Sequence, residues 1–389
     1  MQRFALLVLS AVGLLAAPVF GDLTWTVEQL TTTGSDLHKW ALHVSDGRAA
    51  WAGAAYGQNE DVYYYNGSTV EQLTTTAASE IPTDMDGGAV VWTGLHNGIR
   101  QVNVYRDGVT TRLDTPGWEA HTPRISGVNI AWWGQDSSYH TDLFVHDGVT
   151  VTQVSNDTNG DSSCDISGST VVWQRWDGSG YEVFRHEIGV GGILNLTDSS
   201  RWAFRPRVDG DTVAWVGEIR PNVSNDVFCY CSGIKQLTTL GYLDHYVQPE
   251  VSGDKVVWCS KAGGDYHLYL YDGALQTTTV LASNSTHRYE PKIDGDYVVW
   301  SESDGHDGEI FLYDGATIHQ ITDDDISNGG VQISGDMLAW VGTVDQFGNN
   351  HVFAAHLVPE PCTALSLLCS LAVVMLRQRR LGHGPRRSA

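Results

Sequence analysis

Aromatic, histidine and charged side chains gather in short segments that recur along the chain. Ring faces beside hydrogen-bonding groups are what sugar or peptide binding requires. The residues that could form such a binding face are Trp40, Trp118, His121, Trp202, Arg205, His245, Tyr246, His287 and Tyr289. The alternative is that these side chains only pack between repeated units, because several of them precede a strand at matching repeat positions.

The same segments also offer groups for acid–base catalysis. His121, His245, His287 and Glu290 could serve an exported polysaccharide lyase or hydrolase. They vary from segment to segment without a recognisable constellation, and the sequence contains no HExxH, GxSxG or CxxC pattern and no phosphate-binding glycine loop. We therefore predict a non-enzymatic binding or structural protein, and keep the carbohydrate-active enzyme as the alternative.

One loop resembles a calcium-binding loop. Asp157, Asn159 and Asp161 offer alternating oxygen ligands, but Gly168 stands where the EF-hand pattern requires a glutamate. A polar turn explains the loop better. We therefore predict no metal and no cofactor, with calcium at these three residues as the minor alternative.

The charge of the chain limits its partners. The formal net charge is −23, and residues 22–357 alone carry 17 Lys and Arg against 45 Asp and Glu, a net charge of −28. Such a surface repels nucleic acid and acidic polysaccharide. Neutral glycans, divalent cations and basic proteins remain as candidate partners.

Four cysteines lie in this part of the chain, too few for a disulfide scaffold. They are Cys164, Cys229, Cys231 and Cys259. Cys229 or Cys231 could pair with Cys259 in an oxidising compartment. The alternative is that the cysteines are small buried apolar side chains.

Eight tryptophans at nearly constant spacing reveal the units that position these segments. They are separated by 40 to 43 residues: Trp51, Trp92, Trp132, Trp173, Trp215, Trp258, Trp300 and Trp340. A period of this length with only short apolar runs is typical of a repeat architecture. Consecutive apolar residues such as Val298-Val299-Trp300 indicate strands that are covered on both faces.

Each copy predicts four short strands. In the seventh copy these are Pro291–Ile293, Val298–Trp300, Glu309–Tyr313 and Ile318–Thr322. Two-residue hairpins are expected at the Asn-Gly and Asp-Gly pairs, whose residues tolerate positive φ. These pairs are Asn66-Gly67, Asp107-Gly108, Asp147-Gly148, Asp272-Gly273 and Asp314-Gly315.

Eight units of four strands predict an all-β protein, an eight-bladed β-propeller of four-stranded blades, with seven blades as the alternative. The recurring pattern P.isG..VvW......diy.yd......qlT resembles the TolB-type repeat of bacterial and archaeal surface proteins. The resemblance spans residues 22–357 and implies the propeller fold, but it specifies function hardly at all. The WD40 type is excluded because no repeat tryptophan is followed by aspartate.

The phrase VEQLTTT occurs twice, at residues 27–33 and 70–76. Seven copies end in such a fourth strand, whereas the copy that holds Trp340 runs into the C-terminal tail without one. We therefore expect the N-terminal phrase to supply the missing strand, which would pair an otherwise exposed sheet edge.

Both ends of the chain carry features of export. Residues 1–21 have the short basic start, apolar run and small cleavage-site residues of a secretory signal peptide, which predicts an N-terminal signal helix. Near the other end, Pro359-Glu360-Pro361 precedes an uncharged run at 363–376. A helix of this length covers only about 21 Å, against roughly 30 Å of hydrocarbon. The run is followed by Arg377, Arg379 and Arg380.

This three-part order at 358–380 resembles the PEP-CTERM sorting signal, and residues 381–389 form a further basic tail that such signals usually lack. The resemblance implies an exosortase that recognises Pro359, Glu360 and Pro361. It also implies transient residence in the inner membrane through the C-terminal helix. The expected location is the cell surface or extracellular matrix of a Gram-negative-type bacterium, where a glycan or a surface protein is the expected partner.

Overall fold

The computed structural model describes residues 23–31, 38–54, 58–197, 202–218, 225–231, 233–238, 248–262, 264–284, 289–344 and 350–359. Every regular element in these ranges is a β-strand, which confirms the all-β prediction for this part of the chain. No helix among the described residues is long and apolar enough to cross a membrane. The predicted signal helix at 1–21 and hydrophobic helix at 363–376 lie outside these ranges.

The described strands form six four-stranded sheets and one eight-stranded sheet. The first two sheets contain β2 (His38–Ser45), β3 (Arg48–Ala54), β4 (Asp61–Tyr65) and β5 (Val70–Gln72), then β6 (Pro82–Asp86), β7 (Ala89–His96), β8 (Ile99–Arg106) and β9 (Val109–Leu113). The eight-stranded sheet contains β10 (Trp118–Ser126), β11 (Asn129–Asp136), β12 (Thr141–His146), β13 (Val151–Gln153), β14 (Gly160–Ser167), β15 (Thr170–Trp176), β16 (Tyr181–Glu187) and β17 (Ile193–Asn195). A single parallel pairing, Thr141 with Gly160, joins its two runs of four strands.

Four further sheets complete the order. They contain β18 (Trp202–Asp209), β19 (Thr212–Glu218), β20 (Asn225–Tyr230) and β21 (Ile234–Gln236); β22 (Glu250–Ser252), β23 (Lys255–Ala262), β24 (Asp265–Asp272) and β25 (Thr277–Asn284); β26 (Lys292–Asp294), β27 (Tyr297–Ser303), β28 (Gly308–Tyr313) and β29 (Ile318–Gln320); and β30 (Ser327–Ser334), β31 (Met337–Thr343), β32 (Asn350–Pro359) and β1 (Leu23–Gln29).

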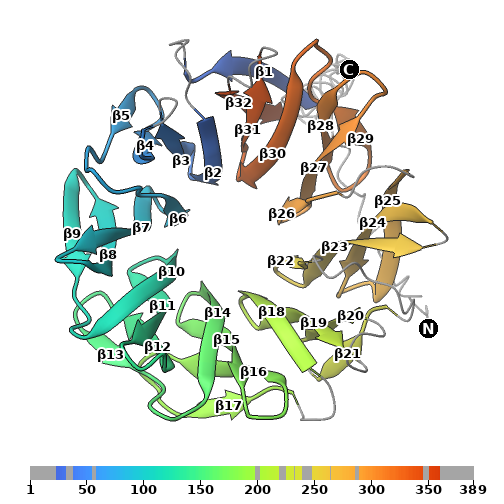
Figure 1. Cartoon of the computed structure of the whole chain (residues 1–389). Coiled ribbons are helices and arrows are strands. Elements are labelled where there is room, and N and C mark those ends of the chain that lie inside the picture. The colour runs from blue at the N-terminus through green and yellow to red at the C-terminus, as the bar shows by residue number, and fades with distance from the viewer. Residues whose placement is uncertain are drawn as a thin grey trace, which may run out of the picture. The chain divides into compact units, whose positions relative to one another are not determined.

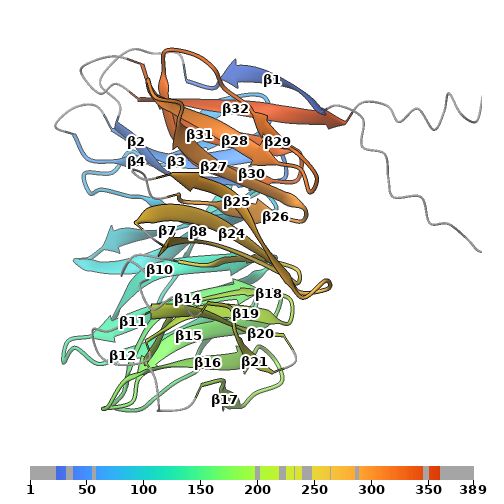
Figure 2. The same ribbon diagram turned by 90° about the vertical axis from the view of Figure 1, so that its right-hand side faces the viewer.

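Contacts divide the chain into a unit of Val27–His356 and a second unit made of the two chain ends. Within the unit Val27–His356 the sheets stand around a common centre, with β2, β6, β10, β14, β18, β22, β26 and β30 innermost (Figure 1). Seen from the side, the strands run roughly along the axis of this arrangement (Figure 2). In the second unit, the Thr24 hydroxyl donates a hydrogen bond to the Val358 carbonyl, at 3.2 Å.

The repeat tryptophans hold the second and third strands of the sheets together. All eight are at most 2% exposed. Trp132, for example, stacks on Phe144 of the neighbouring strand, with ring centroids 6.0 Å apart. A Cβ atom on Gly134 would lie only 2.7 Å from the Phe144 ring, so glycine is required there for the aromatic pair to form.

The hairpin predictions hold in part. Asp107 and Gly108 form the expected two-residue turn, with φ angles of 50° and 82°. In the hairpin after β12, however, the turn is centred one residue later than predicted. The Asp147 carboxylate there accepts hydrogen bonds from the backbone N–H groups of Val149 (2.9 Å) and Thr150 (2.7 Å). An aspartate side chain competes well for nearby N–H groups, which explains the shift.

The same shift occurs at two other predicted hairpins, where Asn66 and Asp314 accept the N–H groups of the residues two and three positions later. The Asp272-Gly273 hairpin differs again, because Asp272 pairs with Thr277 across a four-residue loop.

A circle of hydrogen bonds links the hairpins that follow successive innermost strands, which we call the innermost hairpins. In each link a Ser or Asp side chain at the end of one innermost strand accepts the backbone N–H of the hairpin that follows the next innermost strand, at 2.5 to 3.5 Å. The links are Ser45 to Gly87, Asp86 to Gly127, Ser126 to Gly168, Ser167 to Gly210, Asp209 to Gly253, Ser252 to Gly295, Asp294 to Gly335 and Ser334 to Asp46. The last link returns to the first sheet, so the circle is closed.

The N-terminal strand β1 lies beside β32 and completes the sheet of β30 and β31. The Leu30 N–H donates to the Val352 carbonyl at 2.8 Å. The Thr31 hydroxyl accepts the Val352 N–H at 3.1 Å, as Thr74 accepts the N–H of Val62 at 2.9 Å. Thr31 of the first copy and Thr74 of the second therefore make equivalent hydrogen bonds, the first to the C-terminal strand β32 and the second to β4.

Deleting residues 22–33 should lower the melting temperature by about 5 °C or more. The deletion removes several hydrogen bonds to β32, each of which stabilises by about 1 kcal/mol, and exposes that strand as an edge. Differential scanning calorimetry of the purified protein would measure the change. A matched control is deletion of residues 360–389, which removes no described strand. Equal melting temperatures for the two deletions would contradict the role assigned to β1.

Candidate functional site

A bulge recurs in the innermost strands and controls which side chains line the centre. The residue that adopts the left-handed conformation is Ala41 (φ 51°), Thr122 (38°), Ser163 (52°), Arg205 (55°) or Gly330 (63°). The strand register shifts at each of these positions. Bulges of this kind re-aim the side chains that follow them. In all five strands the residue two positions later lines the central cavity.

The central cavity has a volume of 440 Å³ and is lined by all eight innermost strands. Each contributes one polar side chain at the same repeat position, and we call these eight residues the central ring. In order they are His43, Asp84, Arg124, Asp165, Arg207, Glu250, Lys292 and Gln332. The central ring thus contains three anions, three cations and two neutral groups.

The charges of the central ring alternate in sign and form ion pairs between neighbouring strands. Arg124 lies 3.9 Å from Asp84, and Arg207 lies 3.9 Å from Asp165 and 3.2 Å from Glu250. Lys292 donates a hydrogen bond to the other side of Glu250. Partly buried pairs of this kind are screened less by salt than surface pairs, so they organise the cavity wall.

The surroundings shift the pKa values of the ring residues Glu250, Asp84 and His43. Burial alone would raise the pKa of Glu250, but Lys292 and Arg207 outweigh it and hold this pKa at about 2. Burial raises the pKa of Asp84 to about 6, because Arg124 compensates only in part. Burial together with Arg124 and Lys292 lowers the pKa of His43 to about 3, so His43 is neutral at physiological pH.

The predicted aromatic residues lie at or near the beginnings of the innermost strands, just before the central ring. Trp118 meets Phe144 edge-on, with ring centroids 5.2 Å apart. His121 stacks on Trp133 at 4.0 Å, and burial lowers the pKa of His121. These contacts are the ones that packing side chains make.

Three more of the predicted residues make similar contacts. The Trp202 indole donates to the Ser179 carbonyl at 3.1 Å, and the backbone N–H of Arg205 donates to the side-chain oxygen of Gln174 at 2.9 Å. Tyr289 is only 2% exposed and donates to Glu302 at 3.0 Å. Trp40 lies in β2, and His245, Tyr246 and His287 lie outside the described residues.

The central ring escapes prediction from single segments of the sequence, because no two or three of its members are close in the chain. A usable signal exists in the aligned repeats. The residue before each Ile/Val/Met-Ser/Asp pair is polar in all eight copies, yet its charge changes from copy to copy. The residues predicted for the binding face directed attention to the correct segments, but they lie two to six residues before the ring positions.

The loop that resembled a calcium site already contains a cation. The Arg175 guanidinium lies 2.7 Å from Asp161 and 3.1 Å from Asp157, and the Trp173 indole also donates to Asp161, at 2.9 Å. Asp157 further accepts the N–H of Asn159, at 2.8 Å. A metal ion at these residues would have to displace Arg175.

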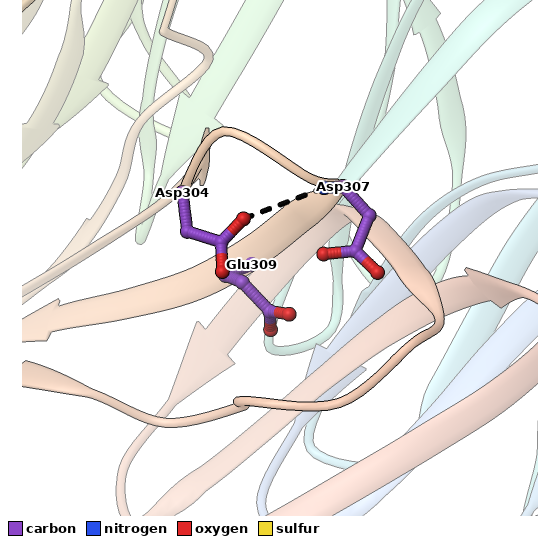
Figure 3. Close-up of side chains that lie close together, drawn as sticks. All are labelled: Asp304, Asp307 and Glu309. Atoms are coloured by element: carbon purple, nitrogen blue, oxygen red, sulfur yellow. Dashed lines mark hydrogen bonds between the residues drawn. The ribbon is translucent and has the colours of Figure 1, made fainter.

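A second group of carboxylates lies between β27 and β28, where Asp304, Asp307 and Glu309 come together (Figure 3). Their oxygen atoms lie within 4.8 Å of one another, so they could hold a metal ion. The Asp307 N–H donates to Asp304 at 3.4 Å. Glu309 is buried, which raises its pKa, and it accepts a hydrogen bond from the Thr322 hydroxyl.

No disulfide joins Cys164, Cys229, Cys231 and Cys259, so the pairing with Cys259 that the sequence left open is not formed among them. Cys164, Cys229 and Cys259 are buried, as expected for small apolar side chains, and Cys231 is exposed. Burial raises the pKa of both Cys164 and Cys229 to about 12, which makes these two thiols unreactive.

Comparison with known proteins identifies the fold. No protein-family model matches the chain, and no curated protein matches its sequence. Among solved structures, a puromycin-hydrolyzing peptidase from Mycobacterium tuberculosis is 11% identical with a TM-score of 0.53, over 79% of this chain and 58% of the peptidase. The β-propeller domain of the Trilobed protease from Pyrococcus furiosus is 12% identical with a TM-score of 0.50, over 82% of this chain and 95% of that domain.

TolB from Acinetobacter baumannii is also similar, at 14% identity and a TM-score of 0.39, over 60% of this chain and 62% of TolB. The chain thus spans less than two thirds of the length of the peptidase and of TolB. The matches to the peptidase and to the protease domain confirm that the body of the chain is of the β-propeller kind.

These matches correct the prediction that the chain is not an enzyme. The fold is shared with a peptidase and with a propeller domain of a protease. A missing catalytic motif therefore does not argue against catalysis in a chain of this fold. At 11 to 12% identity the likeness concerns the fold alone and does not supply an activity.

Replacing His43 with Asn should flatten the acid dependence of stability. Because the pKa of His43 is about 3 in the fold, only the unfolded chain binds this proton as the pH falls below 6.5. Stability from this group is therefore lost between pH 6.5 and 3, by at most about 1.4 kcal/mol for each pH unit. Asp84, with its raised pKa of about 6, acts in the opposite direction between pH 6 and 3.8.

Melting temperatures at pH 7 and 4.5 would test this expectation. The His43→Asn variant should lose less stability on acidification than the unaltered chain, while a variant of the exposed His306 to Asn should behave like the unaltered chain. Parallel curves for all three proteins would contradict the burial of an uncharged His43 beside Arg124, Arg207 and Lys292.

Proposed function

We propose that the chain is an exported, eight-bladed β-propeller that binds a polar ligand in its central channel. The blade count is supported by the sheets: the eight-stranded sheet divides at its single parallel pairing into two groups of four, and six further sheets have four strands each. In this assignment the last blade combines β30, β31 and β32 with the N-terminal β1.

Export and surface sorting are part of the proposal. Residues 1–21 would be removed as a signal peptide, and residues 22–357 would form the propeller. The PEP-CTERM-like segment at 358–380 would hold the chain transiently at the inner membrane. An exosortase-type protease would act at Pro359, Glu360 and Pro361, and would deliver the propeller to the surface of a Gram-negative-type cell.

The observation that carries the binding function is the composition of the central ring. Next to each ring residue along the strand stands an apolar residue and then the Ser or Asp of the hydrogen-bond circle. These two positions meet the same structural demand in every copy, and their residues stay alike. The ring position varies among His, Asp, Arg, Glu, Lys and Gln while it lines a 440 Å³ cavity, which favours recognition of one particular ligand.

The charges of the ring define the kind of ligand. The ring carries three cations and three anions, and the same cavity is also lined by Asp86, Asp209 and Asp294, so it suits a ligand with both donors and acceptors, such as a neutral glycan or a peptide, rather than an anion. The net charge of −28 on residues 22–357 disfavours polyanions as ligands. A glycan or a surface protein is therefore the proposed partner, and the ligand of the channel can equally be a substrate.

Filling the cavity should abolish ligand binding. A Gln332→Trp variant places a large ring in the wall of the cavity without removing a ring charge. On arrays of neutral glycans and short peptides, it should lose at least about tenfold in affinity for any ligand of the channel, since a filled pocket excludes its ligand. The matched control, Val149→Trp, alters a residue of the outer hairpins that is 83% exposed. Equal losses in both variants would contradict a channel site.

The sorting proposal predicts the mass of the mature surface form. Mass spectrometry should show an N-terminus at Asp22 and a C-terminal cut near Pro359–Pro361. A Glu360→Gln variant should keep its C-terminal tail if the Pro-Glu-Pro motif is recognised. A surface form of the unaltered chain that retains Arg377–Arg380 would contradict cleavage.

A further inference from the structure

The charges of the central ring form an open arc with two different ends. From Asp84 the signs alternate through Arg124, Asp165, Arg207 and Glu250 to Lys292, and each member between the ends lies between two opposite charges. The end members have one such neighbour each. Asp84 has Arg124, and Lys292 has Glu250.

Two uncharged side chains separate these ends. Around the centre, β26 contacts β30, β30 contacts β2 and β2 contacts β6. Gln332 of β30 and His43 of β2 therefore lie between Lys292 and Asp84, and His43 is neutral because its pKa is about 3. The arc thus presents a positive end and a negative end across a neutral gap.

Space for a ligand is concentrated at this gap. A cavity of 530 Å³ between β2 and β30 is lined by Ala41, Leu42 and His43 on one side and by Ser327–Gly330 and Gln332 on the other. A second cavity, of 280 Å³, borders Glu250, Tyr289, Lys292 and Gln332. Gln332 lines both of them as well as the central cavity, so three cavities meet at the neutral gap.

The strand β30 is open at this place because its bulge is made of glycines. Gly329 and Gly330 stand where β10 has His121 and Thr122. A Cβ atom on Gly330 would meet no atom within 4 Å, so the wall has room there. The side chains are therefore absent just before Gln332, one of the two uncharged members of the ring.

The negative end is poised to accept a cation. The Asp84 carboxylate accepts the N–H of Ile125 at 3.0 Å and has Arg124 at 3.9 Å, yet burial still raises its pKa to about 6. A second positive group beside Asp84 would stabilise its buried carboxylate, which Arg124 does only in part.

We propose that the gap between Lys292 and Asp84 binds a small zwitterion, a short peptide with both ends free, which lies along Gln332 and His43. The peptide's carboxylate pairs with Lys292 and its ammonium group pairs with Asp84. This inference rests on the proposed binding function of the channel and names its ligand class.

The test uses glycine peptides of two to five residues, measured by isothermal titration calorimetry on the mature chain. Affinity should pass through a maximum at one length, because the two ends must reach both charges at once. Acetylation of the amino end, or amidation of the carboxyl end, should each weaken binding of the best peptide at least tenfold.

Two variants test which ring residue binds each end of the peptide. In Asp84→Asn the acetylated and free peptides should bind equally, and in Lys292→Gln the amidated and free peptides should bind equally. Each variant leaves the neighbouring charge paired, since Glu250 keeps Arg207 at 3.2 Å and Arg124 is still stabilised by Asp165. Lys255→Gln removes a cation that is paired with Asp296 at 3.1 Å in the innermost hairpins and does not line the central cavity. It is the charge-matched control and should change nothing.

Two results would overturn the proposal, and they are distinguishable from a failure of channel binding. One is equal affinity of blocked and free peptides in the unaltered chain. The other is binding of maltotriose, a neutral glycan, that Gln332→Trp blocks while no free peptide binds. In the second case the channel still binds a ligand but the zwitterion assignment is wrong. If neither probe binds and the glycan and peptide arrays are also blank, both proposals fail.

Discussion

The closed circle of hydrogen bonds at the innermost hairpins is the constraint on which the rest of the structure depends. Each bond joins a Ser or Asp side chain of one innermost strand to a backbone N–H of the hairpin after the next innermost strand, and the bond from Ser334 to Asp46 returns the circle to its start. One such bond contributes only about 1 kcal/mol, but in a closed circle no sheet can turn without straining two neighbours. The circle thereby fixes the angle at which each innermost strand meets the centre.

Because the angle of each innermost strand is fixed, the two residues before each Ser or Asp have defined surroundings. The apolar residue before each Ser or Asp packs between strands, and the residue before that one faces the common cavity, which in five of the eight strands follows from the bulge. Ion pairs such as Arg207 with Glu250 can then form between sheets whose strands share no ladder. The rigid strands hold these charges at fixed distances from one another, which mobile loops would not do.

The sequence predicts well the features that recur at a constant spacing, and it predicts poorly the features that depend on contacts between particular side chains. We can read the period of the tryptophans, the number of strands in each copy and the two copies of VEQLTTT from the sequence, because the same residues recur there. The later turn at Asp147 depends on a side chain that competes with the backbone, and the central ring depends on a bulge that re-aims Arg124. Missing catalytic motifs led to the expectation of a non-enzyme, which the fold shared with a peptidase corrects.

The pairing of β1 with β32 also sets the order of events when the chain is made. Thr31 bonds to Val352, 321 residues further on, so the first strand to be synthesised waits for the last one. Until then the body is an open arc of sheets with two unpaired edges, and closing a loop of this length costs conformational entropy. The final fold is reached only when the C-terminal strand has arrived. In the export that we propose, translocation through the membrane can therefore finish before the molecule becomes a closed and rigid body.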